Sequence, residues 1–272
     1  MDVGGSHVTA ALVVGSRVDA RADVDLDPHG TAEQILGTIA GAALELGPQR
    51  HWTLAFPGPF DYARGVGTFD GVAKFGSIAG LDLAAEFGTR LDASVSFVDD
   101  ADSYIMGEWL AGAARGHSRV LGVTLGTGVG ASFLIDGRAQ SGGPGVPPGG
   151  NLYPFDYLGR PIEDTVSTRA LLAAYNQSGV SVREVFERAR HGETSALTVI
   201  NETFEHLGRF LAPFVAEFAA SVLVLGGSIS QSWDLLESPL RRGLGDLDVT
   251  LARSELLDDA PLIGAALAAG RV

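Results

Sequence analysis

The sequence predicts an α/β protein built from two similar halves. Each half opens with a short apolar strand, a glycine-containing turn and a second apolar strand, near residues 2–14 and again near 120–135. Strand-like runs then alternate with helical patterns, which is the order expected when helices pack on sheets. The chain has 272 residues, 46% of them hydrophobic, so it can bury sizeable cores, and its length favours two lobes.

The first half begins with two alternating apolar runs, which indicate antiparallel strands at 8–14 and 17–26. Thr31 is expected to cap a helix that continues to about residue 46, because threonine is a favoured capping residue ahead of an apolar-periodic run. The other elements expected in this half are strands at 51–56 and 95–98 and helices at 81–90 and 101–114.

The second half repeats this opening and then becomes mainly helical. Asp136-Gly137 has the composition of a tight hairpin turn, and residues 141–161, rich in glycine, proline and aromatic side chains, are expected to form an ordered loop. The strands expected here lie at 120–125, 131–135 and 222–225, with a short one near Val249. The helices expected here lie at 168–177, 181–190 and 194–220, from Trp233 onward, and at 261–269.

Composition excludes several classes of function. The formal net charge is −14, so an anionic polymer or membrane would be repelled, and binding to nucleic acid is not expected. The absence of cysteine excludes disulfides, thiolate metal sites and a cysteine nucleophile. No apolar run approaches the roughly 20 residues that span a bilayer, and the first residues lack a signal-peptide pattern. A cytoplasmic protein is therefore expected.

Glycine is unusually frequent and unevenly placed. The chain has 37 glycines, about twice the usual share of roughly 7%. Glycine at the end of a strand lets the backbone approach a ligand closely. The clusters are Gly4-Gly5, Gly126/Gly128/Gly130, residues 142–150 and Gly226-Gly227.

The first cluster belongs to Asp2-Val3-Gly4-Gly5-Ser6. Two glycines and a serine hydroxyl suit a phosphate group, and the carboxylate of Asp2 can hold Mg²⁺ through water. The alternative is a plain turn between two strands. Because only Met1 precedes Asp2, the first strand is either very short or the chain as given begins late.

Two of the three remaining clusters also follow apolar strands. Gly126-Thr127-Gly128 is neither a Walker loop nor a dinucleotide fingerprint, because a strand follows it, and it suits a turn around a phosphate or a simple hairpin. Gly226-Gly227-Ser228 lies between a strand and a helix. It suits the ribose, adenine edge or α-phosphate of a nucleotide, although many α/β proteins carry the same feature structurally.

The most chemical segment is Asp99-Asp100-Ala101-Asp102, at a strand-to-helix junction. Acidic residues are favoured at a helix N-terminus, and this explains Asp102 well. Asp100 is the candidate general base toward a sugar hydroxyl, whereas Asp99 fits a binding or a structural role equally.

The region after residue 141 offers further candidates. Glu163 either reaches substrate hydroxyls or belongs to a helix start, and Tyr153 either lines a sugar site or packs under the loop with Phe155 and Tyr157. The histidines show no metal-binding spacing.

Taken in order, these motifs resemble those of the ROK family of bacterial sugar kinases, which belongs to the actin-like ATPase superfamily. The matching pieces are Asp2-Val-Gly-Gly-Ser6, Phe56-Pro-Gly-Pro59, Val98-Asp-Asp-Ala-Asp102 with Gly107-Glu108, Leu125-Gly-Thr-Gly-Val-Gly130, Glu163-x-x-x-Ser167 and Leu225-Gly-Gly-Ser228. The family's Asn-Asp-Ala-Asn aspartate falls on Asp100, and Asp99 replaces the preceding asparagine, a sugar ligand.

The resemblance implies two actin-like, ribonuclease H-like lobes with a central cleft that holds ATP, Mg²⁺ and a hexose. It implies a first lobe of residues 1–98 plus about 259–272 and a second of 99–258, and a homodimer. It places sugar contacts at Gly58, Asp99 and Glu163, and Mg²⁺ at Asp2. It places phosphate and nucleotide contacts at three glycine turns: Gly4-Gly5-Ser6, Gly126-Thr127-Gly128 and Gly226-Gly227-Ser228.

The sequence departs from the family in residues 148–163. The usual Glu-x-Gly-His sugar and zinc motif and the cysteine motif after it are absent, so no zinc site is expected. Asn151, Tyr153 or Asp156 can replace the missing sugar ligands. Because the phosphate motif starts at Asp2, the helix–turn–helix extension of ROK repressors is not expected here.

The sequence therefore predicts an ATP- and Mg²⁺-dependent kinase that phosphorylates a primary hydroxyl of a hexose or related polyol, with Asp100 as base. Two alternatives stay open: a sugar or nucleotide sensor without turnover, or a kinase with another phosphoryl donor such as polyphosphate.

Overall fold

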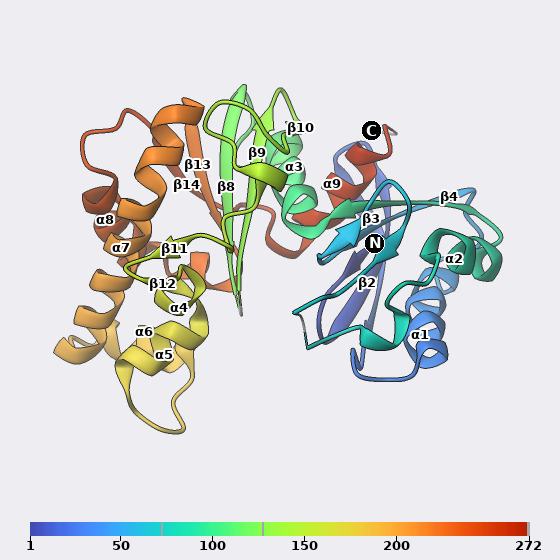
Figure 1. Ribbon diagram of the computed structural model, residues 1–272, viewed down its shortest axis with the longest axis horizontal. Coiled ribbons are helices and arrows are strands. Elements are labelled where there is room, and N and C mark those ends of the chain that lie inside the picture. Colours follow the sequence, from blue (N-terminus) through green and yellow to red (C-terminus); the bar gives the residue numbers. More distant parts are fainter. Residues whose placement is uncertain (72, 127, 271–272) are drawn as a thin grey trace. The chain divides into compact units, whose positions relative to one another are not determined.

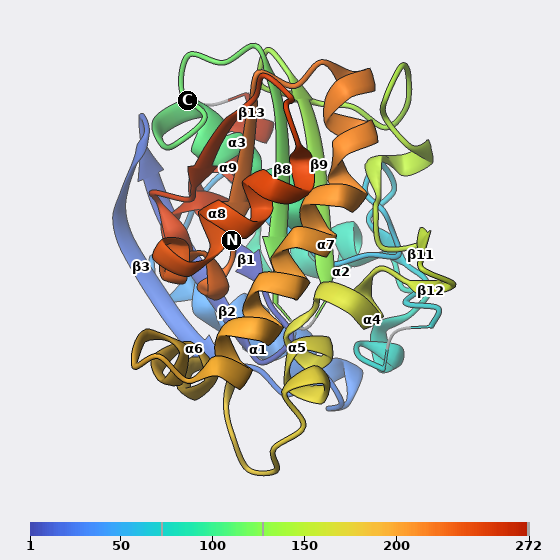
Figure 2. The same cartoon turned by 90° about the vertical axis from the view of Figure 1, so that its left-hand side faces the viewer.

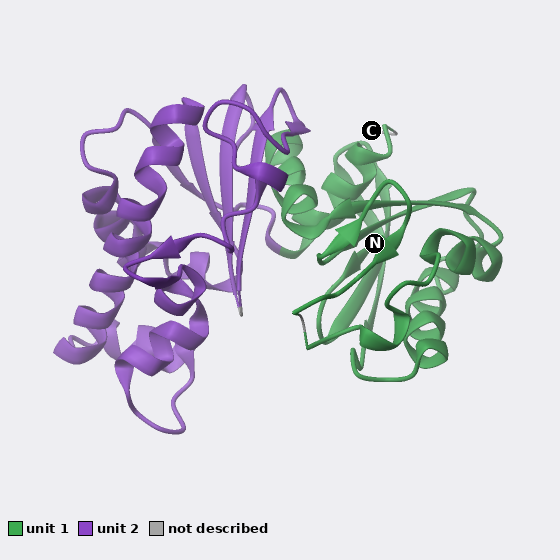
Figure 3. Ribbon diagram, viewed as in Figure 1, with its two compact units in different colours: residues 1–112, 258–272 green, residues 113–257 purple. Residues whose placement is uncertain are grey.

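The computed structural model describes residues 1–71, 73–126 and 128–270. The chain divides into two compact units, shown in Figure 3: unit 1 comprises Met1–Gly112 with Asp258–Val272, and unit 2 comprises Ala113–Leu257. The first segment of unit 1 therefore ends at Gly112, whereas the sequence predicts a first lobe that ends at residue 98. The reason is that helix α3 (Asp100–Ala111) packs against helix α9 (Ala260–Ala268), so both helices belong to unit 1.

Unit 1 contains a five-stranded sheet in the order β3-β2-β1-β4-β7. Strands β1, β2 and β3 are antiparallel, whereas β1, β4 and β7 are parallel (Figure 1). The bounds are β1 (Asp2–Val3), β2 (His7–Val14), β3 (Arg17–Asp25), β4 (His51–Phe56) and β7 (Ser94–Asp99).

Unit 2 contains a sheet with the same plan, in the order β10-β9-β8-β13-β14. Again the strands β10, β9 and β8 are antiparallel, whereas β8, β13 and β14 are parallel. The bounds are β8 (Arg119–Leu125), β9 (Val129–Ile135), β10 (Arg138–Ala139), β13 (Val222–Gly226) and β14 (Thr250–Arg253). The internal repeat and the α/β class expected from the sequence are confirmed.

Helices cover both faces of the unit 1 sheet. Helices α1 (Ala32–Leu44) and α2 (Leu83–Leu91) lie on one face and α3 and α9 on the other (Figure 1). Thr31 caps α1 through a capping box with Gln34, as favoured by the sequence. Beneath α1 and α2 the sheet buries an aromatic group that centres on Phe56, with Phe69 and Phe75 close by.

The helices of unit 2 are α4 (Glu163–Val166), α5 (Thr168–Tyr175), α6 (Val182–Arg190), α7 (Thr194–Phe218) and α8 (Trp233–Leu244). Helices α7 and α8 pack together along one face of the sheet (Figures 1 and 2). Leucine and phenylalanine side chains recur along α7 and bury Ile200, Phe204, Leu207 and Leu211 against the strands. Among the described residues, no helix has the length and apolar character needed to cross a bilayer.

The structure contains three short features that the sequence does not predict. The hairpin of β5 (Phe60–Asp61) and β6 (Val66–Gly67) follows β4, and the helix α4 precedes α5. The loop after β10 contains a second hairpin, β11 (Asp156–Tyr157) and β12 (Arg160–Pro161). Elements this short have too few residues to show an apolar period.

The contact between α3 and α9 depends on two glycines that allow the backbones to approach closely. A Cβ at Gly264 would overlap the carbonyl group of Ser103, and one at Gly107 would overlap that of Ala260. The Ser103 hydroxyl also donates to the Pro261 carbonyl oxygen at 2.6 Å. The final helix is thereby fixed to the helix that carries Asp100.

Replacing Gly264 with alanine is expected to destabilise the protein by about 2 kcal/mol or more, because the methyl group has no space and backbone must shift. The matched control is Gly41→Ala in α1, where an added Cβ meets nothing within 4 Å. This control should stabilise by about 0.5 to 1 kcal/mol, since alanine favours a helix interior. Urea unfolding of both variants measures the difference, and equal stability would contradict the close packing.

Candidate functional site

The candidate residues of unit 1 lie where three parallel strands end. Asp2 pairs in register with Ala55, and Phe56 pairs with Asp99, so β1, β4 and β7 finish at the same edge of the sheet. Ligands of α/β sheets bind at this carboxyl edge. The structure therefore brings Asp2, Gly4, Gly5, Ser6, Gly58, Asp99 and Asp100 to one edge.

The turn between β1 and β2 is a tight glycine turn. The Gly4 amide donates to the His7 carbonyl at 3.0 Å, and the Ser6 carbonyl accepts from Leu26 at 2.9 Å. Gly4 and Gly5 are half-buried, and Ser6 is exposed. The turn presents a small, side-chain-free backbone surface beside a hydroxyl, which suits an anion.

Asp99 ends β7 and caps helix α3. Its Oδ1 accepts the amides of Ala101 and Asp102 at 3.0 and 3.1 Å. Its Oδ2 accepts the hydroxyl of Tyr62 at 2.7 Å. Asp99 is therefore a helix cap, and both lone pairs of its Oδ1 are used.

Tyr62 was missed in the sequence. It lies between β5 and β6, its ring stacks on Phe60 at 5.1 Å, and its hydroxyl also lies 3.1 Å from the Phe56 carbonyl oxygen. Burial and the charge of Asp99 raise the pKa of Tyr62 well above its ordinary value, so the phenol stays protonated and donates. No local pattern marks this tyrosine, because its partner is 37 residues away.

Asp100 opens α3 and is exposed to solvent, so a substrate can reach it. The pKa of its carboxyl is raised to about 7, mainly because the surrounding protein atoms desolvate it. The negative charges of Asp99 and Asp2 contribute to this rise. The Ala101 amide donates to Oδ1 at 2.8 Å and opposes the shift. Burial also raises the pKa of Asp99, against its three hydrogen bonds. A group of this kind accepts a proton near neutral pH.

Asp2 is half-buried at the end of β1. Burial raises the pKa of its carboxyl, and the charge of Asp258 raises it further, while His7 lowers it. In the described part of the chain no group of three or more metal-binding side chains is assembled. The residues fit Mg²⁺ only in the way that ion is often held, by one or two carboxylates with water and substrate oxygens.

In unit 2, the β8–β9 turn is held by two neighbours. Thr168 donates its amide and hydroxyl to the Gly126 carbonyl, at 3.1 and 2.8 Å. The Glu163 carboxylate accepts the Val129 amide at 2.8 Å, and a Cβ at Gly128 would collide with that carboxylate. The structure thus places Glu163 on the glycine turn, and Thr127 lies outside the described residues.

The Gly226-Gly227 cluster ends β13, the strand beside β8. Gly226 pairs with Thr124, so its turn lies at the same edge of the sheet as Gly126. Gly227 has a φ of 82°, and a Cβ there would meet the Leu125 carbonyl oxygen. Exposed Ser228 opens a 3-10 turn that ends at Ser232, and helix α8 then begins at Trp233, as the sequence predicts.

The loop after β10 carries the remaining sugar-binding candidates. Asn151 Nδ2 donates to the Gly149 carbonyl at 3.1 Å, and Tyr153 is 43% exposed. Phe155 packs on Phe214 and the Tyr157 hydroxyl lies 3.2 Å from His206, so packing explains these two aromatic residues. Tyr153 alone of the three aromatic residues presents an open surface.

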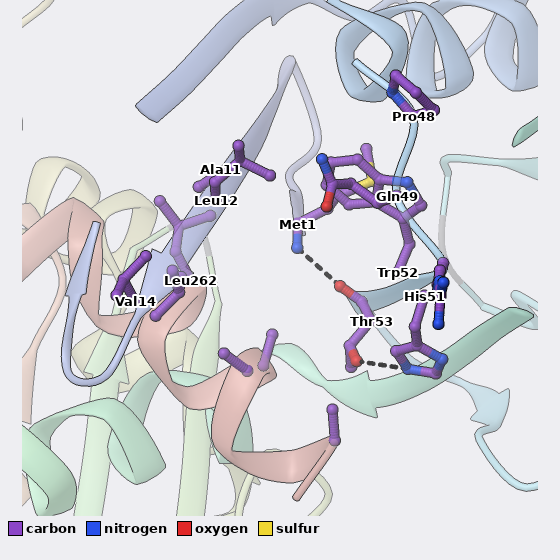
Figure 4. A pocket seen from close by; sticks show the side chains of 15 residues that line it. Met1, Ala11, Leu12, Val14, Pro48, Gln49, His51, Trp52, Thr53 and Leu262 are labelled. Atoms are coloured by element: carbon purple, nitrogen blue, oxygen red, sulfur yellow. Dashed lines mark hydrogen bonds between the residues drawn. The ribbon is translucent and has the colours of Figure 1, made fainter. Parts of the chain in front are cut away.

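Unit 1 also has a cavity of about 630 Å³, and none of the candidate site residues lines it (Figure 4). It is lined by Met1, the end of β2 and the start of β4, and the Met1 amino group donates to the Thr53 carbonyl at 2.7 Å. Because β1 has two residues and β2 has eight, the end of β2 borders this space. The amino ends of β1 and β4 are opposite to the edge that carries Asp100.

The duplicated sheets with glycine turns place the protein in the actin-like class of α/β folds. The chain belongs to the ROK family, whose sequence profile matches residues 1–271.

Among curated relatives, the glucokinase of Thermotoga maritima is 26% identical over 302 aligned residues, which cover 98% of this chain and 95% of that protein. A ROK family glucokinase from Streptomyces griseus, solved with glucose and AMPPNP, superposes with a TM-score of 0.81 at 23% identity, covering 98% of this chain and 97% of that one. A ROK family transcriptional regulator, a homologue of the E. coli MLC protein, also superposes with a TM-score of 0.81, at 20% identity, covering 98% and 76%. The two structural matches show the shared fold.

Replacing Asp99 with asparagine is expected to lower the pKa of Asp100 below about 7, because one neighbouring negative charge is lost while asparagine still caps α3. Carboxyl-carbon NMR titration, with the Asp100 signal assigned through Asp100→Asn, measures the change. Asp19→Asn on β3, an exposed residue paired with Arg17, is the control and should leave that pKa unchanged. An unaltered Asp100 pKa in the Asp99 variant would contradict the coupling.

Proposed function

We propose that the protein is an ATP-dependent sugar kinase that phosphorylates a primary hydroxyl of a hexose or related polyol. The observation that carries the proposal is Asp100, an accessible carboxyl at the strand edge with its pKa raised to about 7, on the same edge as the Gly4–Ser6 turn. Membership in the ROK family and the glucokinase relative support it.

Asp100 acts as the general base. Its carboxylate takes the proton of the acceptor hydroxyl as that oxygen forms a bond to the γ-phosphorus, and the bond from the γ-phosphorus to the bridging oxygen breaks to release ADP. Phosphoryl transfer depends mainly on positioning and on stabilising charge, so the chain needs few further reactive groups.

Each unit offers glycine turns to the nucleotide. In unit 1, Gly4, Gly5 and Ser6 offer backbone amides and a hydroxyl to phosphate oxygens. In unit 2, the turns at 126–128 and 226–228 offer similar surfaces to phosphate and nucleoside groups. Mg²⁺, when bound, would neutralise phosphate charge, and Asp2 would hold it through water.

Acceptor binding is assigned to Gly58, Asp99, Asn151, Tyr153 and Glu163. Of these, Asp99 retains one free acceptor position, on Oδ2, because its other positions are filled by Tyr62 and two amides. From the resemblance to the family we also propose that the protein is cytoplasmic and forms a homodimer.

A sensor without turnover is the second candidate. It is favoured by the loss of the Glu-x-Gly-His and cysteine motifs from residues 148–163 and by the transcriptional regulator that shares the fold. ATP binding without ADP release for any sugar in a panel of hexoses and polyols would support the sensor and contradict the kinase.

Asp100→Asn is expected to lower turnover by about 10²- to 10⁴-fold, the range that a general base contributes, while the Kd for ATP changes little. ADP release coupled to NADH oxidation measures turnover, and calorimetry measures ATP binding. The matched control is Asp82→Asn, which makes the same charge change at the cap of α2 in the same unit. Full turnover in the Asp100 variant would contradict the role of Asp100.

The acidic limb of kcat/KM is expected near pH 7. The base works only when ionised, so activity rises as the pH passes upward through the Asp100 pKa of about 7 and falls below it. A pH series from 5 to 9 on the wild-type protein tests this, and a rate that stays constant down to pH 5 would contradict it.

A further inference from the structure

Lys74 is the single lysine of the 272-residue chain, and it lies against the β1–β2 turn. A Cβ on Gly5 would lie 3.0 Å from Lys74 Cε and 3.2 Å from Cδ, and it would overlap Nζ. The end of the side chain therefore occupies the space that the missing side chain of Gly5 leaves open. Lys74 is half-buried, so only part of it faces solvent.

The segment that carries Lys74 is firmly anchored. The next residue, Phe75, is fully buried, packs on Phe56 with ring centroids 5.4 Å apart, and donates its amide to the Pro28 carbonyl at 2.9 Å. The Ser77 hydroxyl donates to the Gly30 carbonyl at 2.7 Å. These contacts fix the backbone from which the lysine reaches the turn.

The ammonium group has no protein partner in the part of the chain that the structure describes. Arg17, Arg21 and Arg90 in the same unit pair with carboxylates. Arg50, Arg64 and Lys74 are in no ion pair among the described residues, and of these three only Lys74 lies against the glycine turn. The chain carries a net charge of −14, so carboxylates are plentiful. A cation held beside a glycine turn and left unpaired is suited to an anionic ligand.

We propose that Lys74 binds the terminal phosphoryl groups of the phosphate donor at the Gly4–Ser6 turn. The inference rests on the proposed kinase function and adds to it the residue that supplies positive charge in unit 1. Lysine binds phosphate as a compact point charge, and in this turn it complements backbone amides. The chemistry recognised is a triphosphate chain, whether of a nucleotide or of inorganic polyphosphate.

Because the chain has one lysine, the reactivity of the Lys74 amine can be measured without interference from other lysines. Amine acylation by a limiting N-hydroxysuccinimide ester, followed by peptide mass spectrometry, gives the labelling rate at residue 74 separately from that of the terminal amine. ATP is expected to slow this rate at least about tenfold, and AMP, which lacks the terminal phosphates, is not. Protection by inorganic tripolyphosphate as strong as that by ATP shows that Lys74 recognises the phosphate chain alone, and protection by ATP alone shows that binding also needs the nucleoside. An equal labelling rate with and without saturating ATP overturns the proposal.

Substitution gives an independent measurement. Lys74→Gln is expected to raise the KM for the donor about 10- to 100-fold, and Lys74→Arg to recover part of the loss. Arg50→Gln is the matched control, since it removes one positive charge from an exposed residue at the amino end of β4. Thermal unfolding without nucleotide should be the same for Lys74→Gln and wild type, because Nζ makes no bond within the described residues. An unchanged KM in a folded Lys74→Gln protein overturns the proposal.

The two proposals fail in different ways. Protection of Lys74 by ATP in a protein that phosphorylates no sugar supports the phosphate-binding lysine and contradicts the kinase. Turnover with an unprotected Lys74 supports the kinase and contradicts the lysine.

Discussion

The parallel pairing of β1, β4 and β7 is the constraint on which the chemistry of unit 1 depends. Its register puts Asp2 beside Ala55 and Asp99 beside Phe56, so three strands deliver their following residues to one edge. A shift of one residue would turn each of these side chains to the other face of the sheet. Phe56 anchors the register in the aromatic core, and Asp99, as the cap of α3, fixes where that helix begins and hence where Asp100 lies.

Much of this fold follows from local patterns in the sequence. The strand at 51–56 and the cap at Thr31 agree with the structure, because apolar alternation and capping chemistry act over a few neighbouring residues. The repeat of strand, glycine turn and strand is a local signal as well, and it appears twice in the sheet topology. The two-residue strands β5 and β6 gave no periodic signal. The assignment of α3 to unit 1 depends on packing against α9, about 150 residues later, which a local pattern does not reveal.

Some residues of the candidate site could likewise be predicted from local sequence patterns, and others could not. Asp100 and the glycine turns were predicted from residue types next to strand ends. Tyr62, Lys74 and the bond from Val129 to Glu163 were not, because each acts on a residue far away in the chain. Asp99 shows the limit most clearly: its sequence position fitted a sugar ligand and a helix cap equally, and only the three hydrogen bonds show how much of its carboxylate the fold uses.

The central claim is that Asp100 receives the proton of the acceptor hydroxyl. A crystal structure with a non-hydrolysable ATP analogue and a sugar that supports ADP release tests it most directly. The account predicts a primary hydroxyl within about 2.6 to 3.2 Å of an Asp100 carboxylate oxygen, with that hydroxyl facing the terminal phosphoryl group. A sugar bound with no hydroxyl in reach of Asp100, while the nucleotide is in place, would contradict it.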